Sequence, residues 1–93
     1  MKAIWKNVIV ADSPSTIQLE GNHFFPRKSV KMALLAPSEE RTSCPWKGEA
    51  TYFDVVVKGD RNPAAAWSFE KPRSAAENIE KYIAFWKGIK IEP

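Results

Sequence analysis

The chain has few of the residues that bind metals, form disulfides or carry out covalent catalysis. Its 93 residues include one cysteine, Cys44, and one histidine, His23. A single cysteine forms no disulfide within the chain. One Cys and one His also fall short of the three or four such ligands that a structural zinc ion requires. We therefore expect a domain without a disulfide, a metal ion or a cofactor.

Long apolar runs and a strong charge of one sign are also missing. The apolar segment near the N-terminus is too short for the hydrophobic region of a secretion signal, and no stretch approaches the roughly 20 apolar residues of a membrane-spanning helix. The net charge is +3, and basic and acidic residues are spread over both halves of the chain. Nucleic-acid-binding surfaces concentrate basic residues on one side. We expect a cytoplasmic protein that binds neither a membrane nor nucleic acid.

The chain does contain enough apolar and aromatic side chains for one core. It is 44% hydrophobic and 12% aromatic, and it holds four tryptophans. A chain of this length is too short to bury two separate cores. Residues 1–93 are therefore predicted to form a single domain.

Short alternating segments separated by turn residues predict a mainly β fold. The predicted strands are residues 3–11, 16–20, 50–58 and 64–69, with shorter ones at 23–25 and 89–91. The first two strands are expected to form one hairpin, and 50–58 is expected to pair with 64–69 through a turn at 59–63. Because such links are too short for the crossovers of a parallel sheet, the pairing is predicted to be antiparallel.

The helical segments are predicted to be short. Residues 27–35 suit one helical turn followed by extended chain, and residues 39–41 suit a solvated loop. A helix is expected from about residue 75 to residue 81. Its start is indicated by Ser74 as N-cap and Glu77 three positions later, which match a capping box.

Five segments, in this order and spacing, resemble a known family. They are VIVADS, FFPRKSV, TSCPWKGEATYFDV, AAAWSFEKP and YIAFW, and they span about residues 5–91. The chain is similar here to the domain-of-unknown-function family numbered 427, which some catalogues label nucleotidyltransferase-like. The resemblance implies a small antiparallel β-tent, in which two sheets meet at an angle, as in methionine sulfoxide reductase B and the thalidomide-binding domain of cereblon.

The resemblance implies no established reaction. Many proteins of the β-tent fold hold zinc with two Cys-x-x-Cys pairs, and this chain has neither pair. Phosphoryl transfer, which the nucleotidyltransferase label would require, needs metal-binding carboxylates beside a phosphate-binding loop. Asp54 and Asp60 show no such pairing, and no glycine-rich loop accompanies them.

The densest chemistry of the chain lies in residues 42–55, which begin with Thr-Ser-Cys-Pro-Trp-Lys-Gly. Cys44 is either a thiol activated by the positive charge of Lys47 or a small buried apolar residue, as free cysteines usually are. A nucleophilic thiol would also need a base, and His23 is the one histidine that could serve.

The same turn predicts a pocket. Trp46 and Lys47 lead into a strand, and if Trp67 returns beside that strand, Tyr52 and Trp67 form an aromatic wall next to the turn. Aromatic rings with one basic group suit a small planar or cationic ligand, at about 0.5–2 kcal/mol per cation–π contact. The predicted ligand-binding residues are Trp46, Lys47, Tyr52, Trp67 and Ser68.

Three functions are compatible with these features. The first is a binding module for a small molecule or a modified side chain in the predicted pocket. The second is an enzyme that uses Cys44 in redox chemistry or acyl transfer. The third is a protein–protein adaptor with an aromatic interface. Trp5 and Trp86, near the two ends of the chain, are assigned to the core.

Overall fold

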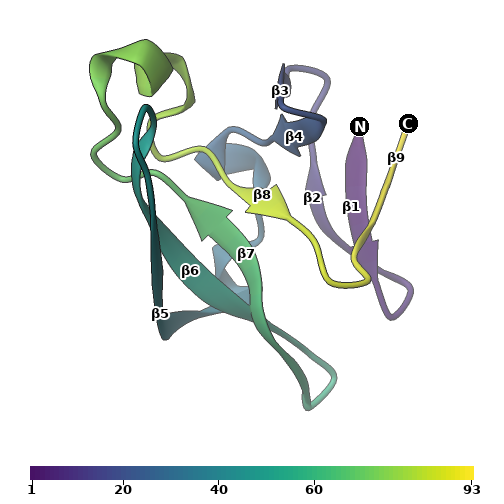
Figure 1. The fold of residues 1–93 in the computed structure, drawn as a ribbon. Helices are drawn as coiled ribbons and strands as arrows, with labels where there is room; N and C mark the ends of the chain where they lie inside the picture. Colours follow the sequence, from purple (N-terminus) through teal and green to yellow (C-terminus); the bar gives the residue numbers. More distant parts are fainter.

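The computed structural model describes residues 1–93, and antiparallel strands make up most of it (Figure 1). A three-stranded sheet has the order β2–β1–β9, with β1 at Lys2–Trp5, β2 at Val8–Asp12 and β9 at Lys90–Glu92. A two-stranded sheet pairs β3 (Ile17–Leu19) with β4 (Asn22–Phe24). The four-stranded sheet has the order β5–β6–β7–β8, from β5 (Leu35–Cys44) and β6 (Gly48–Val57) to β7 (Asp60–Ser68) and β8 (Ala84–Phe85).

The predicted mainly β, antiparallel fold with short helical pieces is confirmed, although the strands form three sheets and not two. An isolated antiparallel bridge between Phe25 and Ile83 joins the end of the two-stranded sheet to the β8 region. The two residues exchange both backbone hydrogen bonds, at 2.7 and 2.9 Å. The bridge thus brings β4 beside the four-stranded sheet.

The predicted hairpin of residues 3–20 is wrong. Lys6 and Asn7, with φ of 52° and 63°, form a tight turn that splits the expected strand into β1 and β2. Two successive residues with positive φ are typical of the two-residue turns that close hairpins. As a result β2 pairs with β1, and the next strand, β3, pairs with β4 instead.

The second predicted hairpin is confirmed, with a shorter turn. β6 pairs with β7, and the turn consists of Lys58 and Gly59, with φ of 54° and 82°. The chain at 60–63, predicted as part of the turn, already belongs to β7. Residues 39–41, predicted as a loop, lie within β5. This edge strand exposes most of its side chains, so it shows no apolar alternation in the sequence.

All three helical segments are 3-10 turns: η1 (Arg27–Ser29), η2 (Met32–Leu34) and η3 (Ser74–Ile79). The first two precede the extended β5, as predicted. The capping box predicted at Ser74 is wrong, since Arg73 is the N-cap of η3 and no side chain caps it. The backbone kinks at Ala76, with φ −124°, so the segment never becomes the regular helix that a capping box starts. No helix of the structure has the length and apolar character needed to span a membrane.

The apolar core consists of two clusters that share the strands of the four-stranded sheet. One includes Val55, Ala66 and Phe85, together with residues of β1 and β2. The other includes Tyr52, Ala84 and residues of β4 and η3. Since neighbouring strand residues point to opposite faces, Ala84 and Phe85 contribute to different clusters. The candidate site lies on the face that holds the second cluster.

Candidate functional site

An open cavity of about 180 Å³ lies among residues brought together from four segments of the chain. Tyr52 of β6 and Trp67 of β7 face each other directly across the strand pair. Trp67 is also paired with Ala84 of β8, and Trp86 follows two positions later on the same side. Asn22 of β4 completes the lining. We call these four residues the aromatic pocket.

The three rings of the aromatic pocket pack against one another. The centroid of Tyr52 lies 6.5 Å from that of Trp67 and 6.4 Å from that of Trp86, with interplanar angles of 35° and 37°. The two tryptophan rings are 5.5 Å apart at 70°, an edge-to-face contact. All three distances lie in the range that aromatic pairs favour, and the two tryptophans have one of the preferred arrangements. The rings therefore hold one another in place.

Two of the rings are also fixed by their polar groups. The hydroxyl of Tyr52 is hydrogen-bonded to the hydroxyl of Thr42 at 3.0 Å, and Trp86 Nε1 donates to the carbonyl of Ala64 at 2.7 Å. This bond holds Trp86 in place although 45% of the residue is exposed. The assignment of Trp86 to the core is wrong: it is a surface residue with an anchored indole.

Two other polar groups of the pocket are unused. The indole N–H of Trp67 and the side-chain amide of Asn22 make no hydrogen bond within the chain. Every buried side-chain nitrogen and oxygen of the protein has a partner. Because Trp67 and Asn22 are half-buried, these two unpartnered groups must reach solvent. Two residues that line the pocket therefore carry solvent-accessible polar groups without a partner in the chain: an indole donor and an amide that both donates and accepts.

Both positive and negative groups lie near the pocket. None of the four lining residues is charged. The ammonium of Lys87 lies 5.1 Å from the centroid of the Trp86 ring, and it donates to the carbonyl of Pro63. The nearby Asp54 carboxylate accepts hydrogen bonds from the backbone N–H of Ala64 at 2.8 Å and from Arg61 at 2.5 Å. These bonds lower the pKa of Asp54, so the carboxylate stays paired and ionised.

Of the five predicted ligand-binding residues, Tyr52 and Trp67 lie in the aromatic pocket, and the other three lie elsewhere. Trp46 is 39% exposed in the turn between β5 and β6. Lys47 is largely buried there, with 13% of its side chain exposed. Its ammonium pairs with Glu20 and lies over the rings of Trp46 and Phe69, at 5.1 and 5.5 Å. The ion pair of Lys47 with Glu20 thus links the β5–β6 turn to the β3–β4 turn.

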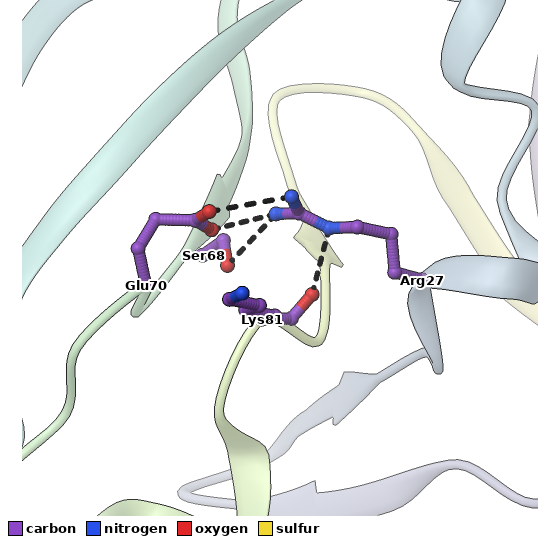
Figure 2. Close-up of polar contacts among 4 residues, drawn as sticks. All are labelled: Arg27, Ser68, Glu70 and Lys81. Carbon is purple, nitrogen blue, oxygen red and sulfur yellow. Dashed lines mark hydrogen bonds and ion pairs between the residues drawn. The ribbon is translucent and has the colours of Figure 1, made fainter.

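Ser68, the fifth predicted residue, is fully buried on the opposite face from its neighbour Trp67. Figure 2 shows its hydroxyl beside Arg27, whose guanidinium donates to it at 3.3 Å. The same guanidinium forms two hydrogen bonds with Glu70, at 2.6 and 3.3 Å, and donates from Nε to the carbonyl of Lys81 at 3.0 Å (Figure 2). We call these four residues the arginine cluster.

The thiol of Cys44 makes no hydrogen bond to a base. Cys44 is the half-buried last residue of β5 and packs at the margin of the second apolar cluster. His23 makes a hydrogen bond of 3.0 Å with Thr16, and no hydrogen bond joins it to Cys44. No three His, Cys, Asp or Glu side chains gather in a group that could hold a metal ion.

A second, more polar cavity of about 300 Å³ lies between the β1–β2 turn and the C-terminal strand. Its lysines already have partners. Lys6 pairs with Asp60 at 3.1 Å and also lies over the ring of Trp5, while Lys90 is 3.9 Å from Glu92. The aromatic pocket, with its unused donors, is the stronger candidate site.

Sequence reasoning did not find Asn22 or Trp86. The pair Gly21-Asn22 is typical of a tight turn, and the place of Asn22 in the pocket depends on the bridge between Phe25 and Ile83, which are far apart in sequence. For Trp86 a signal existed, because Ala84 and Trp86 alternate on one face of a strand that follows the helical segment.

The fold and the site define a small antiparallel β domain with an open aromatic pocket. Comparison with known proteins gives the family. The model of the domain of unknown function DUF427 matches residues 1–92, so the chain belongs to this family, as the sequence motifs predicted. A search of the curated proteins gave no match.

Proposed function

We propose that this protein is a binding module that holds a small molecule, or the modified end of a side chain, in the aromatic pocket. The observation that supports the proposal best is the state of Trp86. Its indole is anchored at the surface by the bond to Ala64, in contact with two further rings, yet it is nearly half exposed. Covering such a ring gains roughly 25 cal/mol per Å² of apolar surface.

The size of the pocket limits the ligand. Sites for drug-sized molecules usually measure about 300–1,000 Å³, and this cavity is smaller, at about 180 Å³. A single ring or the tip of a longer molecule fits that volume. The cavity is open, so the remainder of a longer ligand can extend into solvent.

The proposal includes a cytoplasmic location and binding without zinc. The one cysteine of the chain is free, which suits a reducing compartment. All four lining residues recognise ligands through rings, an amide and an indole N–H, and none of these is a zinc ligand.

The test compares two exposed tryptophans. A library of single-ring fragments is screened against the wild-type protein by ligand-observed NMR, and the hits are titrated against variants. Trp86→Ala is expected to weaken the hits at least tenfold. Trp46→Ala is the matched control, since Trp46 is similarly exposed but outside the pocket, and it should leave affinity within about twofold.

Thermal melts of both variants check that they remain folded. The proposal is overturned if no fragment binds the wild-type protein at millimolar concentration, or if Trp46→Ala weakens binding as much as Trp86→Ala does.

A further inference from the structure

We infer that the aromatic pocket selects a neutral planar ring whose edge carries a carbonyl next to an N–H group, in preference to a cation. Pyrimidine bases and cyclic amides belong to this ligand class. The inference rests on the proposed function and adds the chemistry of the ligand.

The positive charge of Lys87 beside the Trp86 ring disfavours a cation. Aromatic sites for cations are strengthened by a carboxylate, because the rings alone provide a weak attraction. Here the lining has no carboxylate, and the nearby Asp54 is already bonded to Arg61 and to Ala64 N–H. Lys87 places its own ammonium 5.1 Å from the Trp86 centroid. A cationic ligand would meet this positive charge at the same ring.

The unused polar groups favour a ring with a mixed edge. Trp67 Nε1 can only donate, so it calls for an acceptor such as a carbonyl oxygen. The amide of Asn22 both donates and accepts, which matches a carbonyl and an N–H side by side. A site built to hydrogen-bond such an edge rejects analogues that lack it, because its polar groups are then left unpaired.

The rings provide the remaining surface. Trp67 and Trp86 meet at 70°, so a ligand ring that lies flat on one of them presents its edge or face to the other. Planar rings stack on aromatic side chains regardless of charge. Stacking alone therefore binds many kinds of ring, and the hydrogen bonds of Trp67 Nε1 and Asn22 provide the selectivity.

Three probes of similar size separate the possibilities: uracil, 1,3-dimethyluracil and tetramethylammonium. Uracil has the carbonyl and N–H edge, and dimethyluracil keeps the ring and carbonyls without the N–H groups. Each is titrated into ¹⁵N-labelled protein. We expect uracil to bind at least tenfold more tightly than tetramethylammonium and severalfold more tightly than dimethyluracil. The indole N–H resonance of Trp67 should move downfield with uracil, whereas that of Trp86, already bonded to Ala64, should move less.

Two variants test the roles of the polar groups. Trp67→Phe keeps an aromatic ring and removes the indole N–H, so it should weaken uracil at least fivefold. Tetramethylammonium loses only the difference between an indole and a phenyl ring, so its affinity should fall by less. Asn22→Asp adds the carboxylate that the pocket lacks, and it should shift the preference towards tetramethylammonium by at least tenfold. Melting temperatures of both variants verify folding.

The outcomes distinguish this inference from the proposed function. If tetramethylammonium binds the wild-type pocket more tightly than uracil, the inference is wrong and the binding module stands. The same holds if other fragments of the library bind and uracil does not. If no probe and no fragment binds, both are wrong.

Discussion

Trp67 and Ser68 are neighbours on β7, and their side chains lie on opposite faces of the sheet. The two faces differ in whether the polar groups named here have hydrogen-bond partners within the chain. On the Ser68 side, the arginine cluster uses Nε, Nη1 and Nη2 of Arg27 in hydrogen bonds, and the serine hydroxyl is fully buried (Figure 2). On the Trp67 side, an indole N–H and an amide have no partner and face solvent. We conclude that the first face stabilises the fold, and we propose that the second keeps groups available for a ligand.

The largest predicted effect on stability concerns Arg27. Its replacement by alanine removes a two-pronged ion pair with Glu70 and the donor to the buried hydroxyl of Ser68. Hydrogen bonds to charged groups contribute about 1.5–3 kcal/mol each when buried, and the partial exposure of this pair reduces the value. We expect Arg27→Ala to lower the free energy of unfolding by about 2 kcal/mol, measured by urea denaturation.

Arg41→Ala provides the matched control. Arg41 is exposed and donates only to carbonyl groups of its own strand, Ser38 and Glu40, so its loss should cost less than about 0.5 kcal/mol. Arg27→Lys should recover only part of the loss, because an ammonium cannot form the two parallel bonds. Equal effects of the two alanine variants would show that the arginine cluster has no special structural role.

An intermediate effect is predicted for Lys47, which the sequence placed in the pocket. Lys47→Met keeps the apolar stem but removes the ion pair with Glu20 and the contacts of the ammonium with two rings. The expected loss of unfolding free energy is about 1 kcal/mol, because the partner carboxylate is half exposed. Ligand affinity, measured on the same variant by NMR titration, should not change. A clear loss of affinity would show that the β5–β6 turn also contributes to ligand binding. The binding groups would then not be confined to the aromatic pocket.

The strands that form the pocket wall were largely predictable. β6 is rich in β-branched and aromatic residues. β7 returns beside it after the two-residue turn at Lys58 and Gly59, and this antiparallel return places Tyr52 opposite Trp67. The N-terminal hairpin could not be predicted, because the turn at Lys6 and Asn7 interrupts an apolar segment without a glycine or proline. Local pattern gives little warning of such a turn.

The complete site was beyond sequence reasoning because it depends on contacts between distant segments. Asn22 reaches the cavity through the pairing of Phe25 with Ile83. Lys47 stays out of it because Glu20, on another turn, holds the ammonium. Neither partner can be identified from spacing, whereas the alternation that sends Trp67 and Ser68 to opposite faces can.

The smallest effect is predicted for acid stability. The backbone hydrogen bond from Ala64 and the bond and charge of Arg61 lower the pKa of Asp54 from its ordinary value of 3.8. A carboxyl whose pKa is lower in the folded state stabilises the protein above its unfolded pKa, and this stabilisation is lost as the pH falls through the folded value. The melting temperature should therefore fall below about pH 4, and less steeply in Asp54→Asn. Identical pH profiles of the two proteins would exclude this role.

The most direct test of the account is the response of the four tryptophan indole N–H resonances when a fragment that binds the protein is titrated in. Single Trp→Phe variants assign the four signals. We predict that the Trp67 and Trp86 resonances shift with one common saturation curve, while those of Trp5 and Trp46, outside the aromatic pocket, stay in place. Shifts centred on Trp46, with Trp67 and Trp86 unmoved, would contradict the central claim that the ligand binds between β4, β6, β7 and the segment after β8.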